Sequence, residues 1–344
     1  MTNLQQLDTL PPELLTSKAH ELHQHFERPT LIHLPGTRQR PLFLSILLHG
    51  NETTGLTAVQ QLLKKYTATP LPRALSLFLG NTEAAAHHRR RLADQPDYNR
   101  VWPGTHLPDS PETRLMAEIV DIMRDRKVFA SIDIHNNTGL NPHYACVNDL
   151  AAQNLQLANL FSRTIVYFIQ PRGTQSAALS ALCPATTIEC GKPGEPHGIA
   201  HALEFIEACL HISAIPDHPP APHDIAVYHS LARVRIPENT PFGFADKTHQ
   251  PRPDQLIFRS DLETLNFRDA EPGLELGTCP ANGKISLIAT REDGLDITAD
   301  FFTCDAGKLK LRKHSMLSML TRDERVIRQD CLCYLMERLE NPTE

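Results

Sequence analysis

Two short segments of this sequence place metal-binding side chains directly after an apolar run. His49 and Glu52 follow residues 42–48, and His135 ends residues 128–135. Two imidazoles and one carboxylate with an open fourth position form a usual catalytic zinc site. His49 and Glu52 are three residues apart, so both can reach one ion if the chain turns into a helix there. We therefore predict that His49, Glu52 and His135 bind one zinc ion (Zn2+) per chain.

A third apolar run, residues 185–189, ends in another carboxylate, Glu189. A carboxylate that closes a buried strand has no packing role there, but beside a metal it can act as a general base. It would take a proton from water whose pKa the metal has lowered. The chain has 18 histidines, so a single His-x-x-Glu match carries little weight. The prediction rests on three such segments all ending apolar runs.

The elements that must position these groups alternate along the first two-thirds of the chain. Continuous apolar runs predict buried strands, and apolar residues at helical spacing predict helices between them. The strands are expected at 42–48, 75–79, 128–135, 165–169 and 185–189, and the helices at 52–66, 110–126 and 198–212. This alternation favours an α/β fold with a mixed, mainly parallel sheet and helices on both faces. In such sheets, ligands bind beyond the carboxyl ends of the strands.

The sequence changes character after residue 214. Residues 215–222 are rich in proline, which removes backbone donors and fixes φ, and we interpret them as a linker. We therefore expect a catalytic domain at 1–214 and a smaller β-rich C-terminal domain at 223–344. Strands are expected in the second domain at 225–236, 255–259, 284–290 and 295–302.

Bulk composition excludes several classes of protein. The 344 residues carry a net charge of −6, and the pI is about 6.3, so nothing indicates a nucleic-acid or membrane-surface partner. No apolar run is long enough for a membrane span, and the first residues do not resemble a signal peptide. The eight cysteines form no disulfide framework. We expect reduced cysteines and a cytoplasmic location.

Four motifs together resemble the succinylglutamate desuccinylase/aspartoacylase family, which is related to the zinc carboxypeptidases. They are His-Gly-Asn-Glu at 49–52, Asp-Tyr-Asn-Arg at 97–100, Asp-Ile-His-Asn at 133–136 and Ile-Glu-Cys-Gly at 188–191. Their order and approximate spacing fit the family over residues 40–210. Residues 262–267, which precede Gly273, are similar to the family's C-terminal β domain.

The resemblance implies further roles. Asn99 and Arg100 would bind the substrate carboxylate, and an upstream arginine would polarise the scissile carbonyl. The run 89–91 contains three candidates, of which Arg91 matches best. Glu189 would return its proton to the leaving amine.

Two residues near the predicted ligand His135 are further candidates. Asn136 follows it directly and is a candidate for a hydrogen bond to substrate. Asp133 points the same way as His135 on a strand, because side chains two residues apart share a face. It could orient this ligand or pair elsewhere in the core.

These observations predict a zinc-dependent hydrolase that cleaves an amide bond next to a carboxylate, acting on a small N-acyl amino acid. A metallocarboxypeptidase that releases C-terminal residues from short peptides uses the same chemistry and stays open. A third alternative is a metal-binding or regulatory protein without catalysis. Glu189 argues against it, because a structural metal site needs no general base. A homo-oligomer is compatible with the sequence.

Overall fold

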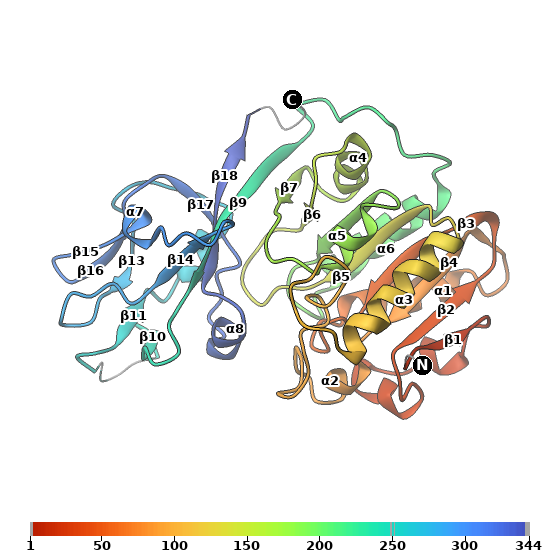
Figure 1. Ribbon diagram of the computed structural model, residues 1–344, viewed down its shortest axis with the longest axis horizontal. Coiled ribbons are helices and arrows are strands. Elements are labelled where there is room, and N and C mark those ends of the chain that lie inside the picture. The colour runs from red at the N-terminus through yellow and green to blue at the C-terminus, as the bar shows by residue number, and fades with distance from the viewer. Residues whose placement is uncertain (1–2, 248–249, 251, 341–344) are drawn as a thin grey trace. The chain divides into compact units, whose positions relative to one another are not determined.

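The computed structural model describes residues 3–247, 250 and 252–340 and contains two compact units (Figure 1). The first unit contains the chain up to Asn136, His143–Val227 and Glu340, and the second contains Asn137–Pro142 and Tyr228–Leu339. A short segment directly after the predicted ligand His135 thus groups with the second unit. As independently folding domains, the ranges 1–214 and 223–344 stay a prediction.

The first unit is built on a mixed, mainly parallel sheet in the order β1-β2-β4-β3-β5-β8-β6-β7. Neighbouring strands run parallel except in the pairs β2/β4 and β6/β8. The strands are β1 Gln5–Leu7, β2 Thr30–Leu34, β3 Gly36–Ile46, β4 Leu71–Leu79, β5 Ala130–His135, β6 Tyr144–Val147, β7 Thr164–Tyr167 and β8 Ala185–Glu189.

Helices cover both faces of this sheet. On one face, Gly55 of α1 lies against the side chains of Ile46 and Ile134. On the other, α3 shares a buried core with Phe43 and Trp102, and it crosses in front of the strands in Figure 1. The helices are α1 Thr54–Lys65, α2 Thr82–Ala86, α3 Pro111–Asp125, α4 Ala152–Phe161, α5 Gln175–Leu179 and α6 Pro196–His211, with 3-10 turns η1 Pro12–Leu15 and η2 Ala19–Gln24. The predicted fold class is confirmed.

The second unit is rich in short strands. One sheet has the order β9-β18-β17-β12 with β14 paired to β9, and the other has the order β10-β11-β13-β16-β15. Their bounds are β9 Ala226–Arg235, β10 Phe242–Phe244, β11 Leu256–Phe258, β12 Asp269–Ala270, β13 Glu275–Thr278, β14 Ile288–Arg291, β15 Phe302–Asp305, β16 Lys308–Leu311, β17 Ser315–Ser318 and β18 Cys333–Leu339; η3 Leu262–Leu265, α7 Thr298–Phe301 and α8 Glu324–Gln329 complete the unit. The strand predicted at 295–302 is wrong, because its second half forms α7.

One pair of cysteines corrects the expectation of a fully reduced chain. Cys279 and Cys304 of the second unit are joined in a disulfide, with Cα atoms 6.2 Å apart. The sequence spacing could not reveal this pair, because Cys279 follows β13 and meets the turn between β15 and β16, where its N donates to Gly307 O at 2.9 Å, only in the folded sheet. None of the helices in the described part of the chain has both the length and the hydrophobicity that a membrane-spanning segment needs.

His33 on β2 makes the stability of the first unit depend on pH. Its side chain is buried and its Nδ1 lies 2.9 Å from Ser76 Oγ. Burial, reinforced by the charge of Arg126, lowers the pKa of His33 from 6.5 to about 4. The unfolded chain therefore binds a proton before the folded chain does, so the stabilising contribution present above pH 6.5 is lost as the pH falls towards 4.

We expect the free energy of unfolding to fall by about 2 kcal/mol more between pH 7 and pH 5 in the wild type than in His33→Asn. Urea unfolding curves of both proteins at the two pH values measure this difference. Equal losses in the two proteins would show that His33 does not titrate as described.

Candidate metal centre

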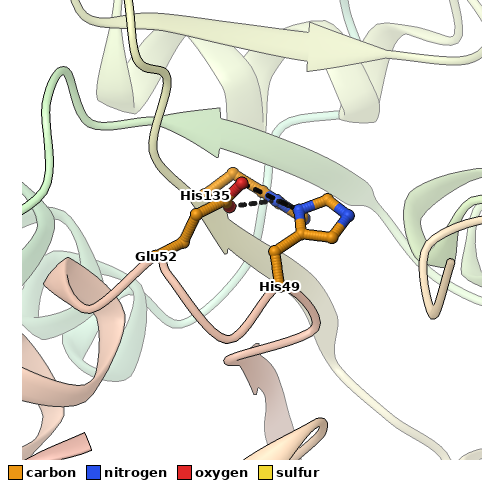
Figure 2. Close-up of side chains that lie close together, drawn as sticks. All are labelled: His49, Glu52 and His135. Atoms are coloured by element: carbon orange, nitrogen blue, oxygen red, sulfur yellow. Dashed lines mark hydrogen bonds and ion pairs between the residues drawn. The ribbon is translucent and has the colours of Figure 1, made fainter. Parts of the chain in front are cut away.

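The three predicted ligands meet at one point of the first unit, at the carboxyl ends of β3 and β5 (Figure 2). His49 Nδ1 lies 2.8 Å from one carboxylate oxygen of Glu52, and His135 Nδ1 lies 2.7 Å from the other. The two Nδ1 atoms are 3.1 Å apart. All three side chains are buried. Residues separated by more than 80 positions in the sequence thus present their donor atoms to one another.

The spacing of these donor atoms fits a tetrahedral zinc ion. Zinc bonds of about 2.0–2.1 Å place neighbouring ligand atoms about 3.3 Å apart in a tetrahedron. One donor atom from each of His49, Glu52 and His135 can be chosen so that all lie within 4.8 Å of one another. Two imidazoles and a carboxylate leave the fourth position open, as in catalytic sites. The donor set therefore fits zinc in number, kind and spacing.

The outer nitrogen of each imidazole is held by a second carboxylate. His49 Nε2 lies 2.9 Å from Asp97 Oδ1, and His135 Nε2 lies 2.6 Å from Asp133 Oδ2. Ser45 Oγ donates to the other oxygen of Asp133 at 2.6 Å. A carboxylate on the outer nitrogen fixes the tautomer and leaves Nδ1 for a metal. Of the two roles that the sequence left open for Asp133, the structure shows contact with His135.

The local backbone explains how His49 and Glu52 reach the same point. Leu47, directly after β3, has a left-handed conformation with φ of 56°, which costs a non-glycine residue about 1–3 kcal/mol. Asn81 N compensates by donating to Leu47 O at 2.7 Å. At Gly50, a Cβ would lie 2.2 Å from Ala85 N, so only glycine permits this close approach. The tight turn then enters α1.

Glu189 ends β8 directly beside His135, because the two residues are register partners on adjacent parallel strands. Burial raises the pKa of Glu189 to about 7, and the nearby carboxylate of Glu52 adds to this rise, while His135 opposes it. A carboxylate with a raised pKa next to a metal site is suited to taking and returning a proton near neutral pH.

Charge in this cluster is unevenly distributed. Burial opposes ionisation of Glu52, but the imidazoles of His49 and His135 outweigh it and hold the pKa of Glu52 well below its usual value. Burial also opposes the charged form of His135, but the charges of Asp133 and Glu52 outweigh burial and raise the pKa of His135 well above its usual value. Several carboxylates thus converge in a buried space, and such charges need cations or a metal as partners. This electrostatic environment favours a divalent cation.

The arginine beside the cluster is Arg90. Its Nη2 donates to Asp97 Oδ2 at 3.0 Å, and its Nη1 lies 3.6 Å from Glu52 Oε1. Arg91, which the sequence favoured, instead donates to the backbone carbonyls of Leu92 and Gln95. Consecutive side chains point in different directions, and motif spacing alone could not decide between them. Arg90 rather than Arg91 therefore contacts the cluster, and which arginine polarises the scissile carbonyl stays a prediction.

Arg100 lies in an irregular loop next to the cluster. Its Nη1 donates to Asn99 O at 2.7 Å, and its charge is one of those that lower the pKa of Asp97. The loop is held by Trp102 N, which donates to Gly173 O at 3.1 Å. Gly173 has φ of 76°, and a Cβ there would lie 2.3 Å from Arg100 O. Arg100 thus offers a half-buried guanidinium to an acidic group.

The two asparagines predicted to contact substrate already have partners inside the protein. Asn99 Nδ2 lies 3.1 Å from both Asp133 Oδ2 and His135 Nε2, and Asn99 Oδ1 accepts from the backbone of α5. Asn136 N donates to Glu52 Oε2 at 3.1 Å, and its side chain bonds Thr54 and a backbone carbonyl. The side chain of Asn99 and the backbone N of Asn136 therefore brace the predicted ligands in this structure. The sequence also missed Asp97 as a ligand partner, although it opens the motif at 97–100.

A family model described as the succinylglutamate desuccinylase/aspartoacylase catalytic domain matches residues 39–212, just over half of the chain. No curated protein sequence matches the chain.

Several solved structures share the fold. A succinylglutamate desuccinylase from Chromobacterium violaceum is 16% identical with a TM-score of 0.56, covering 88% of this chain and 85% of that one. A succinylglutamate desuccinylase/aspartoacylase from Rhodobacter sphaeroides is 15% identical with a TM-score of 0.56, covering 91% and 90%. Murine aminoacylase 3 is 14% identical with a TM-score of 0.53, covering 88% and 96%.

The family match begins within β3, ends just after α6 and includes every residue of the candidate centre. The members of this family are hydrolytic deacylases, and the family is related to the zinc carboxypeptidases. The chain therefore belongs to the succinylglutamate desuccinylase/aspartoacylase family.

Proposed function

We propose that this protein is a zinc-dependent deacylase that hydrolyses the amide bond of an N-acyl amino acid. The observation that carries the proposal is the meeting of His49 Nδ1 and His135 Nδ1 at the carboxylate of Glu52. The outer nitrogens of both rings are turned away to carboxylates of their own. The Nδ1 atoms of both rings and the carboxylate of Glu52 are thus left to bind one ion. Glu189 lies next to them on the neighbouring strand β8.

The residues of the chain have separable tasks in this reaction. When bound, zinc supplies a Lewis acid that polarises the scissile carbonyl and makes water more acidic. Glu189 takes a proton from the attacking water as its oxygen bonds to the carbonyl carbon. The same carboxyl group then gives the proton to the amide nitrogen as the carbon–nitrogen bond breaks. The products are a carboxylate and a free amine.

Two arginines serve binding and charge stabilisation. Arg100 pairs with the substrate carboxylate, because its planar guanidinium can make two parallel hydrogen bonds. Arg90 is anchored on Asp97 and stabilises the negative charge that develops on the carbonyl oxygen. Asn99 and Asn136 hold the groups around the ion.

The test combines metal analysis with a panel of substrates. The purified protein is expected to contain one zinc per chain and to hydrolyse N-succinyl or N-acetyl amino acids. A protein that binds no stoichiometric metal would contradict the proposal. Predominant release of C-terminal residues from short peptides would identify a carboxypeptidase instead.

Replacing Arg100 with alanine should raise KM for the acyl amino acid by about 10–100-fold, since a hydrogen bond to a charged group contributes about 1.5–3 kcal/mol. Arg100→Lys keeps the charge but lacks the planar guanidinium, so its KM should lie between those of the wild type and Arg100→Ala. Arg114→Ala removes an arginine from an exposed ion pair with Asp109 and is the matched control. Steady-state kinetics measure all three variants. An unchanged KM in Arg100→Ala would remove Arg100 from the binding site.

A further inference from the structure

The segment Asn137–Pro142, which we call the strap, connects two parts of the candidate centre while grouping with the second unit. The ligand His135 and its neighbour Asn136 precede the strap directly. Tyr144, which follows it closely, opens β6 and is the register partner of Glu189. Both ends of the strap therefore continue into strands that carry or flank the reacting groups.

Asn266 fastens the strap within the second unit. Its side chain is 6% exposed, and its Nδ2 donates to Leu140 O at 3.2 Å and to Leu320 O at 2.8 Å. Its Oδ1 accepts from Leu320 N at 2.8 Å. One amide side chain thus binds the strap on one side and both backbone groups of Leu320 on the other. Asn266 belongs to the motif at 262–267, to which the reaction assigns no task.

Three further contacts hold the strap at the same place. Thr138 Oγ1 donates to Thr321 Oγ1 at 3.0 Å, and Asn141 Oδ1 accepts from Met319 N at 3.1 Å. At Gly139, a Cβ would lie 1.8 Å from Leu320 O, so the two backbones touch. Because hydrogen bonds are spread along this short segment, only one backbone arrangement of the strap satisfies all of them.

Within the first unit, the residue that directly precedes the strap is hydrogen-bonded to a predicted metal ligand. Asn136 N donates to Glu52 Oε2 at 3.1 Å, and Asn136 Oδ1 accepts from Thr54 N at 3.1 Å. A displacement of the strap therefore moves Asn136, and with it the carboxylate of Glu52 and the end of β5 that carries His135.

We propose that Asn266 is a positioning residue for the metal centre, acting through the strap on His135 and Glu52. It touches neither metal nor substrate. It fixes the backbone that follows His135, so that the donor atoms of His49, Glu52 and His135 keep the spacing that zinc requires. This inference rests on the proposed function, because it needs zinc to bind at His49, Glu52 and His135.

The test compares Asn266→Leu and Asn141→Ala with a matched control, Ser315→Ala. Ser315 is also buried in the second unit and donates to Met336 O, but it does not contact the strap. Zinc affinity is measured by competition with a chromophoric chelator, and the visible spectrum of the cobalt-substituted protein reports the geometry of the ligands. We expect Asn266→Leu to weaken zinc binding about 10–100-fold and to change the cobalt spectrum. Asn141→Ala should have a smaller effect, and Ser315→Ala none.

The outcomes distinguish this inference from the proposed function. A wild type that binds no zinc contradicts the proposed function. A wild type that binds zinc, with Asn266→Leu within twofold of Ser315→Ala and an unchanged cobalt spectrum, overturns the positioning role. Should Asn266→Leu not fold, Asn141→Ala decides, because that side chain is only half-buried. Wild-type affinity and spectrum in Asn141→Ala would then overturn the role.

Discussion

Glu189→Gln is expected to lower kcat by about 10²–10⁴-fold while the protein keeps its zinc. General base catalysis contributes rate enhancements of this size, and glutamine has the shape of glutamate but cannot take the proton. Glu189 lies next to the ligands on β8 without belonging to the donor set of His49, Glu52 and His135. The loss should therefore appear in kcat and equally in kcat/KM, because the lost interaction exists only in the transition state.

Three measurements on the same preparation check this expectation: zinc content, steady-state kinetics and thermal unfolding. Glu204→Gln, on the exposed face of α6, is the control for the chemical change alone. The unfolding temperature of Glu189→Gln should stay the same or rise, since burying a carboxylate costs free energy. Normal turnover in Glu189→Gln would mean that another group is the base. Loss of zinc would mean that Glu189 serves the metal directly.

Glu52→Gln should abolish both stoichiometric zinc and activity. The carboxylate of Glu52 bridges the two imidazole nitrogens, and its pKa lies well below the usual value because of His49 and His135. A neutral amide removes the charge that a divalent cation needs and turns a donor towards the ion. We expect zinc affinity to fall by at least 100-fold, beyond the roughly 10–100-fold that residues around the ligands contribute.

Metal dependence gives this variant a second signature. Zinc bound at the proposed site would stabilise the folded wild type by mass action, so adding a strong chelator should lower the unfolding temperature of the wild type and leave that of Glu52→Gln unchanged. An equal response of both proteins to the chelator would place the ion elsewhere. Activity in Glu52→Gln at saturating zinc would reduce the role of this carboxylate to affinity alone.

The first unit could be predicted well because its elements carry strong local signals. The apolar runs at 128–135 and 185–189 correspond to β5 and β8, and Ser110 caps α3 with a proline at its first position. β1, β2 and β6, each of three to five residues, were missed, because such short runs give a weak local signal. In the second unit, strands of two to four residues depend on contacts distant in sequence, so α7 was mistaken for a strand.

In the candidate site, the sequence could predict which residues take part more easily than where their side chains point. His49, Glu52 and His135 were predictable because each follows an apolar run and has a metal-binding side chain. The choice between Arg90 and Arg91 depends on which way one turn of backbone faces, and no local pattern records that. The bracing roles of Asn99 and Asn136 arise from contacts across strands and were also invisible.

The hydrogen bonds between β5 and β8 have a consequence for redesign. They set the separation of His135 and Glu189 at the pitch of a sheet, and a shift by one residue would turn Glu189 to the opposite face. Arg100 and Gly173 instead sit in irregular loops, which tolerate exchange and insertion far better. The loop of Arg100 also carries Asp97 and Asn99, which contact the predicted ligands His49 and His135. An engineer seeking new acyl or amino-acid preferences should therefore vary the loop around Gly173 and leave both the strand ends and residues 97–99 alone.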